Sequence, residues 1–294
     1  MRRIFVALVL AAALLTPLAA QANLVTDPGF NNPFTVGSLT VPSTDGLWLI
    51  ASPSSWNNPP NGLAVSTGGE DWLIQGCTLP SCFGPGWQVK LSFDYQSNGT
   101  GQVEIDGFAP SQTWDPAAGT STGTPLTTVT LPTNGSMTPF QTSFFSGPGS
   151  QNFASLGVGF NLAPGTDVSL SVDNVVLDLV APVSFRLTPM TLNLKSQGNF
   201  VTGFISNPPS CFTLADINQG TVQLTYGGGA IPAQMINAQG KKFMVKFDRG
   251  ALIKLLNGTT GQVTLTVTGA FNDGIAFAGN ATINVINPGK GKKK

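Results

Sequence analysis

The sequence predicts an all-β protein built from two β-sandwiches and one short helix. Short runs in which apolar and polar residues alternate recur along the chain, which is the pattern of half-buried strands. The 35 glycines and 22 prolines fall mostly in the turns between these runs. A chain of 294 residues is long enough for two domains of ordinary size, and we expect them at 23–180 and 183–288.

The first 22 residues have the composition of an export signal. A basic pair, Arg2-Arg3, precedes an apolar run from Ile4 to Leu15, and Ala20-Gln-Ala22 fits a cleavage site. We therefore expect cleavage near Ala22 and a mature protein that is secreted or held at the cell surface. No later run approaches the roughly 20 apolar residues of a membrane-spanning helix, so we expect no membrane span.

Two segments bracket the first half and predict how it closes. It opens with Asn23-Leu-Val-Thr-Asp-Pro-Gly-Phe30 and ends with Leu170-Ser-Val-Asp-Asn-Val-Val-Leu177. A jelly roll places its first and last strands side by side, so we expect a jelly-roll β-sandwich over 23–180. The apolar phase shifts at Asp173-Asn174, which predicts a β-bulge there, because a one-residue slip would otherwise turn the core face outward.

The clearest strand of the first half is 87–95. Its apolar face begins with Trp87 and ends with Tyr95, and the residues between them alternate without a break. The opposite face carries Lys90, Ser92 and Asp94. This strand is therefore expected to be half-buried, with one face in water.

The second half shows seven short strand patterns between residues 183 and 286, a density typical of an immunoglobulin-like β-sandwich. One helical turn interrupts them, with Asp248 as its expected N-cap and Gly258 as its end. Its apolar stripe is Leu252, Leu255 and Leu256. Residues 289–294 contain four lysines and are expected to be a disordered basic tail.

Both halves resemble modules of exported proteins. The bracketing segments of the first half resemble those of galactose-binding-like jelly rolls, the family that supplies many carbohydrate-binding modules. The second half is similar to an immunoglobulin-like module of exported bacterial proteins in three segments, Thr191–Ser196, Val245–Arg249 and Val267–Gly274. The first resemblance implies carbohydrate binding, whereas the second implies no known activity.

The first resemblance also bears on calcium. Such domains often hold a structural calcium ion with a Glu after Gly-Phe and an Asp in the final strand. The corresponding residues here are Asn31 and Asp173. Asn31 removes one charge from a site that would depend on oxygen ligands, and no other cofactor is expected.

The formal net charge of zero conceals a split between the two halves. Residues 23–180 carry one base and 11 acids, a net charge of −10, whereas residues 181–294 carry 11 bases and three acids, a net charge of +8. The split is open to several interpretations: surface composition without a role, docking of one half on the other, charge-driven head-to-tail self-association, or polyanion binding by the second half.

The three cysteines are an odd number for an oxidising compartment. Cys77 and Cys82 enclose only four residues, and we expect them to form a local disulfide. Cys211 is then left over as a buried thiol.

The absence of histidine excludes Ser-His-Asp and Cys-His catalysis and histidine zinc sites. Paired carboxylates remain as a route, as in glycosidases. After residue 22 the chain has two glutamates, Glu70 and Glu104, and neither lies in a recognisable catalytic context. We therefore expect no enzyme activity.

The five tryptophans all fall in the first half. Those at 48, 72 and 87 lie in apolar runs and are expected in the core. Trp56 and Trp114 lie in polar, turn-rich segments, and we expect them to be exposed platforms for sugar rings, with Asn57 and Gln112 binding the hydroxyls. The alternative is that each ring closes an end of the sandwich.

The sequence thus favours a secreted, non-catalytic protein that binds carbohydrate or a cell-surface glycan through its first half. The alternative is a structural or adhesive extracellular protein without a small ligand, and a glycan-active enzyme is a second alternative. Nucleic acid is not an expected partner, because the first half would repel phosphates and the basic second half shows no interleaved aromatic pattern.

Overall fold

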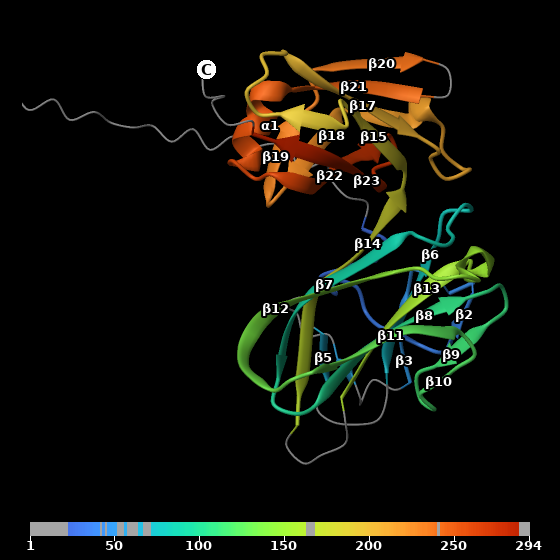
Figure 1. Cartoon of the computed structure of the whole chain (residues 1–294). Helices are drawn as coiled ribbons and strands as arrows, with labels where there is room; N and C mark the ends of the chain where they lie inside the picture. The colour runs from blue at the N-terminus through green and yellow to red at the C-terminus, as the bar shows by residue number, and fades with distance from the viewer. Residues whose placement is uncertain are drawn as a thin grey trace, which may run out of the picture.

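The computed structural model describes residues 23–41, 43–44, 46–51, 56–57, 64–66, 72–162, 168–239 and 242–287. The expected export signal and the expected basic tail lie outside these residues. Within them the protein is all-β, as the sequence predicts, with a single α-helix (Figure 1). None of the described helices is long and apolar enough to cross a membrane.

Two sheets form the first half. The first sheet has the order β1 (Thr35–Val36), β3 (Trp48–Ile50), β6 (Leu73–Thr78), β13 (Ser155–Leu162), β8 (Gly101–Phe108) and β11 (Thr124–Leu131). The second sheet contains β12 (Asn134–Phe145), β7 (Gln88–Ser97), β14 (Leu170–Pro182), β5 (Ala64–Ser66) and β4 (Trp56–Asn57).

Alternation along β7 places the core between these sheets. Val89, Leu91 and Phe93 are buried, and the residues between them are partly exposed. The Phe93 ring meets that of Phe160 on β13 edge to face, with the centroids 5.0 Å apart. The expected half-buried strand is therefore confirmed, and its polar face is left to water.

The bracketing segments lie side by side, as predicted. Leu24 donates its N–H to the Leu177 carbonyl at 2.9 Å, and the Asn23 side chain both donates to Val175 and accepts from Leu177. The β7–β14 register shifts between Asp173 and Val176, which confirms the bulge. Asn174 at the bulge has a φ of 53°, a left-handed conformation that asparagine tolerates better than most residues.

A small third sheet covers the outer face of the first one. It has the order β10 (Thr120–Ser121), β9 (Thr113–Asp115) and β2 (Leu39–Thr40). Its central side chain, Trp114, lies over Gly157 and Gly159 of β13, where a Cβ atom would come within 3.1 Å and 2.4 Å of the indole ring. The two glycines therefore provide the space into which the ring packs.

The second half contributes two further sheets. Beyond β14, the long sheet continues through β23 (Ala276–Ile286), β22 (Gly261–Phe271), β18 (Ile217–Tyr226) and β19 (Gly229–Pro232), and β16 (Thr191–Asn193) pairs with β23. The other sheet has the order β15 (Ser184–Thr188), β17 (Phe200–Ser206), β21 (Lys242–Asp248) and β20 (Met235–Gln239).

The single α-helix, α1 (Arg249–Leu256), follows β21 and is capped as predicted. The Asp248 carboxylate accepts a hydrogen bond from the Ala251 N–H at 2.6 Å, which satisfies one of the donors that a helix N-terminus leaves unpaired. Leu252 and Leu256 are fully buried. The C-cap is Asn257, with a φ of 45°, immediately before Gly258.

The two halves are joined by backbone pairing. Strand β14 runs through the predicted domain boundary and pairs in parallel with β23, with Val180 opposite Ala276. Aromatic rings continue the contact: Phe212 stacks on Phe271 with the centroids 4.0 Å apart and lies 6.5 Å from Trp87 of the first half. The division at 180–183 stays a prediction, because one sheet passes through it.

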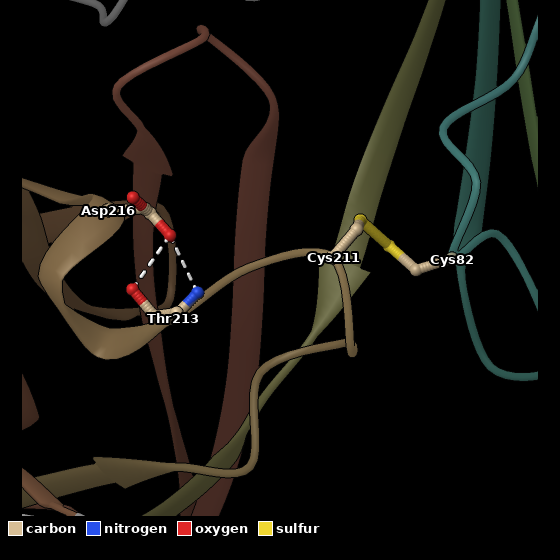
Figure 2. Close-up of a disulfide and its surroundings, with 4 residues drawn as sticks. All are labelled: Cys82, Cys211, Thr213 and Asp216. Atoms are coloured by element: carbon tan, nitrogen blue, oxygen red, sulfur yellow. Dashed lines mark hydrogen bonds between the residues drawn. A yellow bond between two sulfur atoms is a disulfide. The ribbon is translucent and has the colours of Figure 1, made fainter.

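A disulfide also joins the two halves, and it is not the expected one. Cys82 is bonded to Cys211, 129 residues away, with their Cα atoms 5.3 Å apart (Figure 2). The prediction of a Cys77–Cys82 bridge is therefore wrong, as is that of a leftover thiol at Cys211. The reason is that Cys77 belongs to β6 and points into the core, with 1% of its surface exposed, whereas Cys82 lies in the loop that faces the second half.

Candidate binding groove

The polar face of the second sheet is hollowed where β12, β7 and β14 run side by side. The first of two adjoining hollows has a volume of about 530 Å³ and is lined by Lys90, Leu91, Ser92, Gln141, Thr142, Ser143 and Asp178. The second has a volume of about 500 Å³ and is lined by Ser92, Phe93, Asp94, Pro139, Phe140, Gln141 and Asn174. Since Ser92 and Gln141 line both, we treat them as one groove.

The strand register explains how the groove acquires its polar residues. Ser143, Lys90 and Asp178 lie directly opposite one another on β12, β7 and β14 and therefore share one face of the sheet. Gln141 and Ser92 form the next row, and Asp94 faces Pro139 and Asp173 beyond it. The residues of β7 that alternate with the core thus become the floor of the groove.

Asp178 is the most informative residue of the groove. Asp178 is buried, with 9% of its surface exposed, yet its Oδ1 atom has no hydrogen-bond partner within the described part of the chain. Burial raises the pKa of Asp178, and the opposing charge of Lys90 partly offsets this. A buried carboxylate oxygen without a donor is costly, so a ligand hydroxyl that donates to it would be bound favourably.

Other polar groups in the groove are fixed in place before any ligand arrives. The Asn174 amide donates to Asp94 Oδ2 at 2.8 Å, and the Gln88 amide donates to Ser143 Oγ at 3.3 Å. Gln141 is exposed on β12 and lines both hollows. The groove therefore offers donors and acceptors in rows that follow one another every second residue along the strands, which suits a ligand with many hydroxyl groups.

The structure places the predicted sugar-binding tryptophans away from the groove. Trp56 and Trp114 are each only 1% exposed, so the prediction that they form exposed platforms is wrong. Trp114 packs on the glycines of β13, and Trp56 on β4 belongs to the main core. The prediction inferred exposure from the polar residues that flank each tryptophan. In a short strand those neighbours point away from the ring, so they do not indicate whether it is buried.

The two amides predicted beside these rings do not form a site with them. Both ends of the Gln112 side chain bond to nearby backbone: Oε1 accepts from the Ala109 N–H, and Nε2 donates to the Thr122 carbonyl, each at 2.6 Å. The backbone of Asn57 pairs with Val65, and its side chain lies outside the described residues.

Asn31 and Asp173 do approach each other, as the calcium prediction requires. A Cβ atom at Gly29 would lie 3.3 Å from Asn31 Nδ2 and 3.7 Å from Asp173 Oδ1. However, Asn31 donates from both its backbone and its amide to Asp27 Oδ1, and Asp173 Oδ1 accepts from Asn174. These groups are held by hydrogen bonds, and the described residues contain no cluster of three or more acidic, Cys or His side chains arranged for a metal.

Asp27 and Asp216 are also carboxylates that accept hydrogen bonds from neighbouring residues in turns. Partial burial raises the pKa of Asp27, but hydrogen bonds from Asn32 and Asn31 outweigh it and lower the pKa. Asp216 accepts from the N–H and the hydroxyl of Thr213, close to the disulfide (Figure 2), and these bonds lower its pKa. Both carboxylates therefore stabilise turns.

A pair of carboxyl groups lies on the outer face of β8, near Trp114. Asp106 has no exposed surface, and its carboxyl group lies beside that of Glu104. Burial, together with the neighbouring charge of Asp106, raises the pKa of Glu104 to about 7. Asp106 is fully buried and Glu104 is partly exposed, and the pair lies on a different sheet from the groove.

No protein-family model and no curated protein matches the chain. Among solved structures, it is similar to the carbohydrate-binding module CBM4, with 16% identity and a TM-score of 0.37 over 53% of this chain and 99% of that one. It is also similar to TmCBM61 in complex with β-1,4-galactotriose, with 11% identity and a TM-score of 0.28 over 53% and 97% of the two chains.

A third similar structure is the adhesin domain of Epf from Streptococcus pyogenes, with 10% identity and a TM-score of 0.23 over 87% of this chain and 90% of that one. Identity is 16% or lower in all three. The groove therefore has to be assessed from this chain's own residues.

Proposed function

We propose that the protein is a secreted, non-catalytic carbohydrate-binding protein whose ligand lies in the groove over β12, β7 and β14. The observation that carries the proposal is the buried Asp178 carboxylate, whose Oδ1 atom lacks a donor at the floor of a polar hollow. Sugar hydroxyls are donors of the right kind, and they are also acceptors for the Lys90 ammonium in the same row.

The shape of the groove supports an extended ligand over a compact one. The two hollows adjoin along the strands, and their polar groups follow one another in rows from Ser143 to Asp94. An oligosaccharide presents hydroxyls along its whole length. Because the described lining contains no tryptophan and only the half-buried Phe140 as a partly accessible ring, hydrogen bonds would supply most of the binding.

A glycan array probed with the full mature chain tests the proposal, followed by calorimetry on any glycan that binds. We expect Asp178→Asn and Gln141→Ala each to weaken binding by about tenfold, the effect of one or two lost hydrogen bonds. Thr130→Ala on β11 is the matched control, because Thr130 is an exposed strand residue on the other sheet. An array without any bound glycan would refute the proposal and favour the structural or adhesive alternative.

A further inference from the structure

The outer face of the sheet β15-β17-β21-β20 combines positive charge with apolar side chains, and nothing in the described chain covers it. The residues that point outward from its four strands include Arg186, Phe200, Phe204, Met235, Lys242, Met244 and Lys246. All of them are partly or fully exposed, and Met235 is 52% exposed. The solvent-facing side of an antiparallel sheet is instead commonly polar.

The cations and the rings are interleaved across neighbouring strands. The Arg186 guanidinium lies 5.0 Å from the centroid of the Phe204 ring, which faces it across the β15–β17 pair. The Lys246 ammonium lies 5.7 Å from the centroid of the Phe200 ring on the adjoining strands. Asp248 lies at the end of this face and caps α1, and the three cations Arg186, Lys242 and Lys246 outweigh its charge.

Each cation–ring pair can be explained by the stability that it contributes to the sheet. That explanation does not account for the exposure of so many apolar side chains on one face. Phe, Met and Arg are the residue types that are enriched in protein interfaces. A partner for this face should be negatively charged, because burying Arg186 and Lys246 without opposite charges would be unfavourable. The first half of the same chain carries a net charge of −10.

The acidic residues of the first half are also gathered at one place. Asp94 lies directly opposite Asp173 on the β7–β14 pair, and Gly29, two residues after Asp27, would place a Cβ atom 3.7 Å from the Asp173 carboxylate. We call these three residues the acidic patch. Asp27, Asp94 and Asp173 are all partly exposed, so a second molecule could reach them.

The two surfaces cannot meet within one molecule. The halves are held together by the β14–β23 pairing and by the Cys82–Cys211 bond. Figure 1 shows β20 and β21 at the end of the molecule that lies farthest from the first half. We therefore propose that the basic face of one molecule docks on the acidic patch of a second copy, which makes the protein associate head to tail.

Such an interface is heterologous, so it propagates unless the geometry closes a ring. The basic face is separate from the proposed glycan groove, whereas Asp94 of the acidic patch also lines that groove, so the association is measured without glycan. Long-range attraction would weaken as the Debye length falls from about 30 Å at 0.01 M salt to about 8 Å at 0.15 M. We expect the association constant to fall at least about tenfold over that range.

Sedimentation velocity on the mature chain tests the proposal. The expected result is a mass that rises with protein concentration at 0.01 M salt, and loss of association in both Arg186→Gln/Lys246→Gln and Asp94→Asn/Asp173→Asn. The control, Lys195→Gln/Lys254→Gln, removes the same charge from the same half away from the basic face and should associate like the wild type. Far-UV circular dichroism checks that each variant is folded.

Mixing the two deficient variants gives the sharper result. Each retains one intact surface, so together they should form a dimer of one molecule of each and no larger species. A wild-type mass that stays monomeric at every concentration and salt would overturn the proposal, as would association that persists in Arg186→Gln/Lys246→Gln. Tight binding of polyglutamate by a strictly monomeric chain would overturn it in favour of a polyanion ligand for this face.

Discussion

The disulfide between Cys82 and Cys211 is a second covalent link between the halves beside the polypeptide chain, and its removal should uncouple their unfolding. The bridge joins the loop after β6 to the loop before β18, on either side of the point where β14 passes from one half to the other. Cys82 and Pro182 line the same small hollow at this junction. The perturbation is the double variant Cys82→Ser/Cys211→Ser.

Two loop lengths set the size of the effect. If the whole chain unfolds at once, the bond closes a loop of 129 residues, which corresponds to about 5 kcal/mol at 25 °C. If the second half unfolds while the first stays folded, Cys82 is held next to Pro182, and the closed loop runs only from Pro182 to Cys211. A loop of roughly 29 residues corresponds to about 3.5 kcal/mol, and this is the loss that we expect for the second half.

Urea unfolding followed by two probes measures the loss. Tryptophan emission reports on the first half, since all five tryptophans lie there, whereas far-UV circular dichroism reports on both halves. The wild type should show coincident transitions. In the double variant the circular dichroism change should begin about 1–3 M lower in urea, for an m-value of about 1–3 kcal/mol/M, with a small early change in emission from Trp87, which contacts Phe212.

Thiol titration in denaturant provides the control, because the wild type should show one reactive thiol, that of Cys77. Cys77→Ser should keep the coincident transitions, although it alters a buried position. Three reactive thiols in freshly prepared protein, or unchanged and coincident transitions in Cys82→Ser/Cys211→Ser, would refute the reasoning.

Two further predictions concern the first half. Glu104 has a pKa of about 7 in the folded protein and near 4.5 in the unfolded chain, so the unfolded state binds fewer protons and stability should fall as the pH rises through that window. Glu104→Gln should flatten the pH dependence of the urea midpoint measured at pH 4.5, 6 and 8, and an unchanged pH dependence would contradict the partial burial of Glu104 beside Asp106. Gly159→Ala should lower the free energy of unfolding by about 1–3 kcal/mol, because its Cβ would lie 2.4 Å from the Trp114 ring. The control is Gly135→Ala on β12, which has no atom within 4 Å of its Cβ and should leave the thermal midpoint unchanged. Equal effects of the two variants would contradict the packing of Trp114 on Gly159.

Features that depend on short stretches of chain could be predicted from the sequence. The alternation over 87–95, the bulge at Asp173-Asn174 and the Asp248 cap each follow from the conformational preferences of neighbouring residues. The pairing of the first and last segments of the first half was also predictable, because it follows from how a jelly roll closes. The structure confirms all of these elements.

Features that depend on distant residues could not be predicted in this way. The partner of Cys82 lies 129 residues away, and only the arrangement of the two halves brings it near. The burial of Trp114 depends on Gly157 and Gly159, which lie on a different sheet. A polar sequence context therefore gave the wrong exposure, since the glycines that receive the ring carry no signal near it.

The groove could be predicted from the sequence only in part. The polar face of 87–95, with Lys90, Ser92 and Asp94, was visible in the sequence as the face left to water. What the sequence lacked was the register that places Gln141 and Asp178 beside it. In the same way, the basic face became apparent only when β15, β17 and β21 brought separate cations and rings together, although the sequence suggested no interleaved aromatic pattern.

Hydrogen–deuterium exchange, measured with and without a bound oligosaccharide, tests the central claim most directly. The groove proposal predicts that protection on binding is concentrated in β7, β12 and the stretch of β14 around Asp178, with little change in the small sheet that contains Trp114. Protection centred on β2, β9 and β10, or spread evenly over both halves, would contradict a ligand site in the groove.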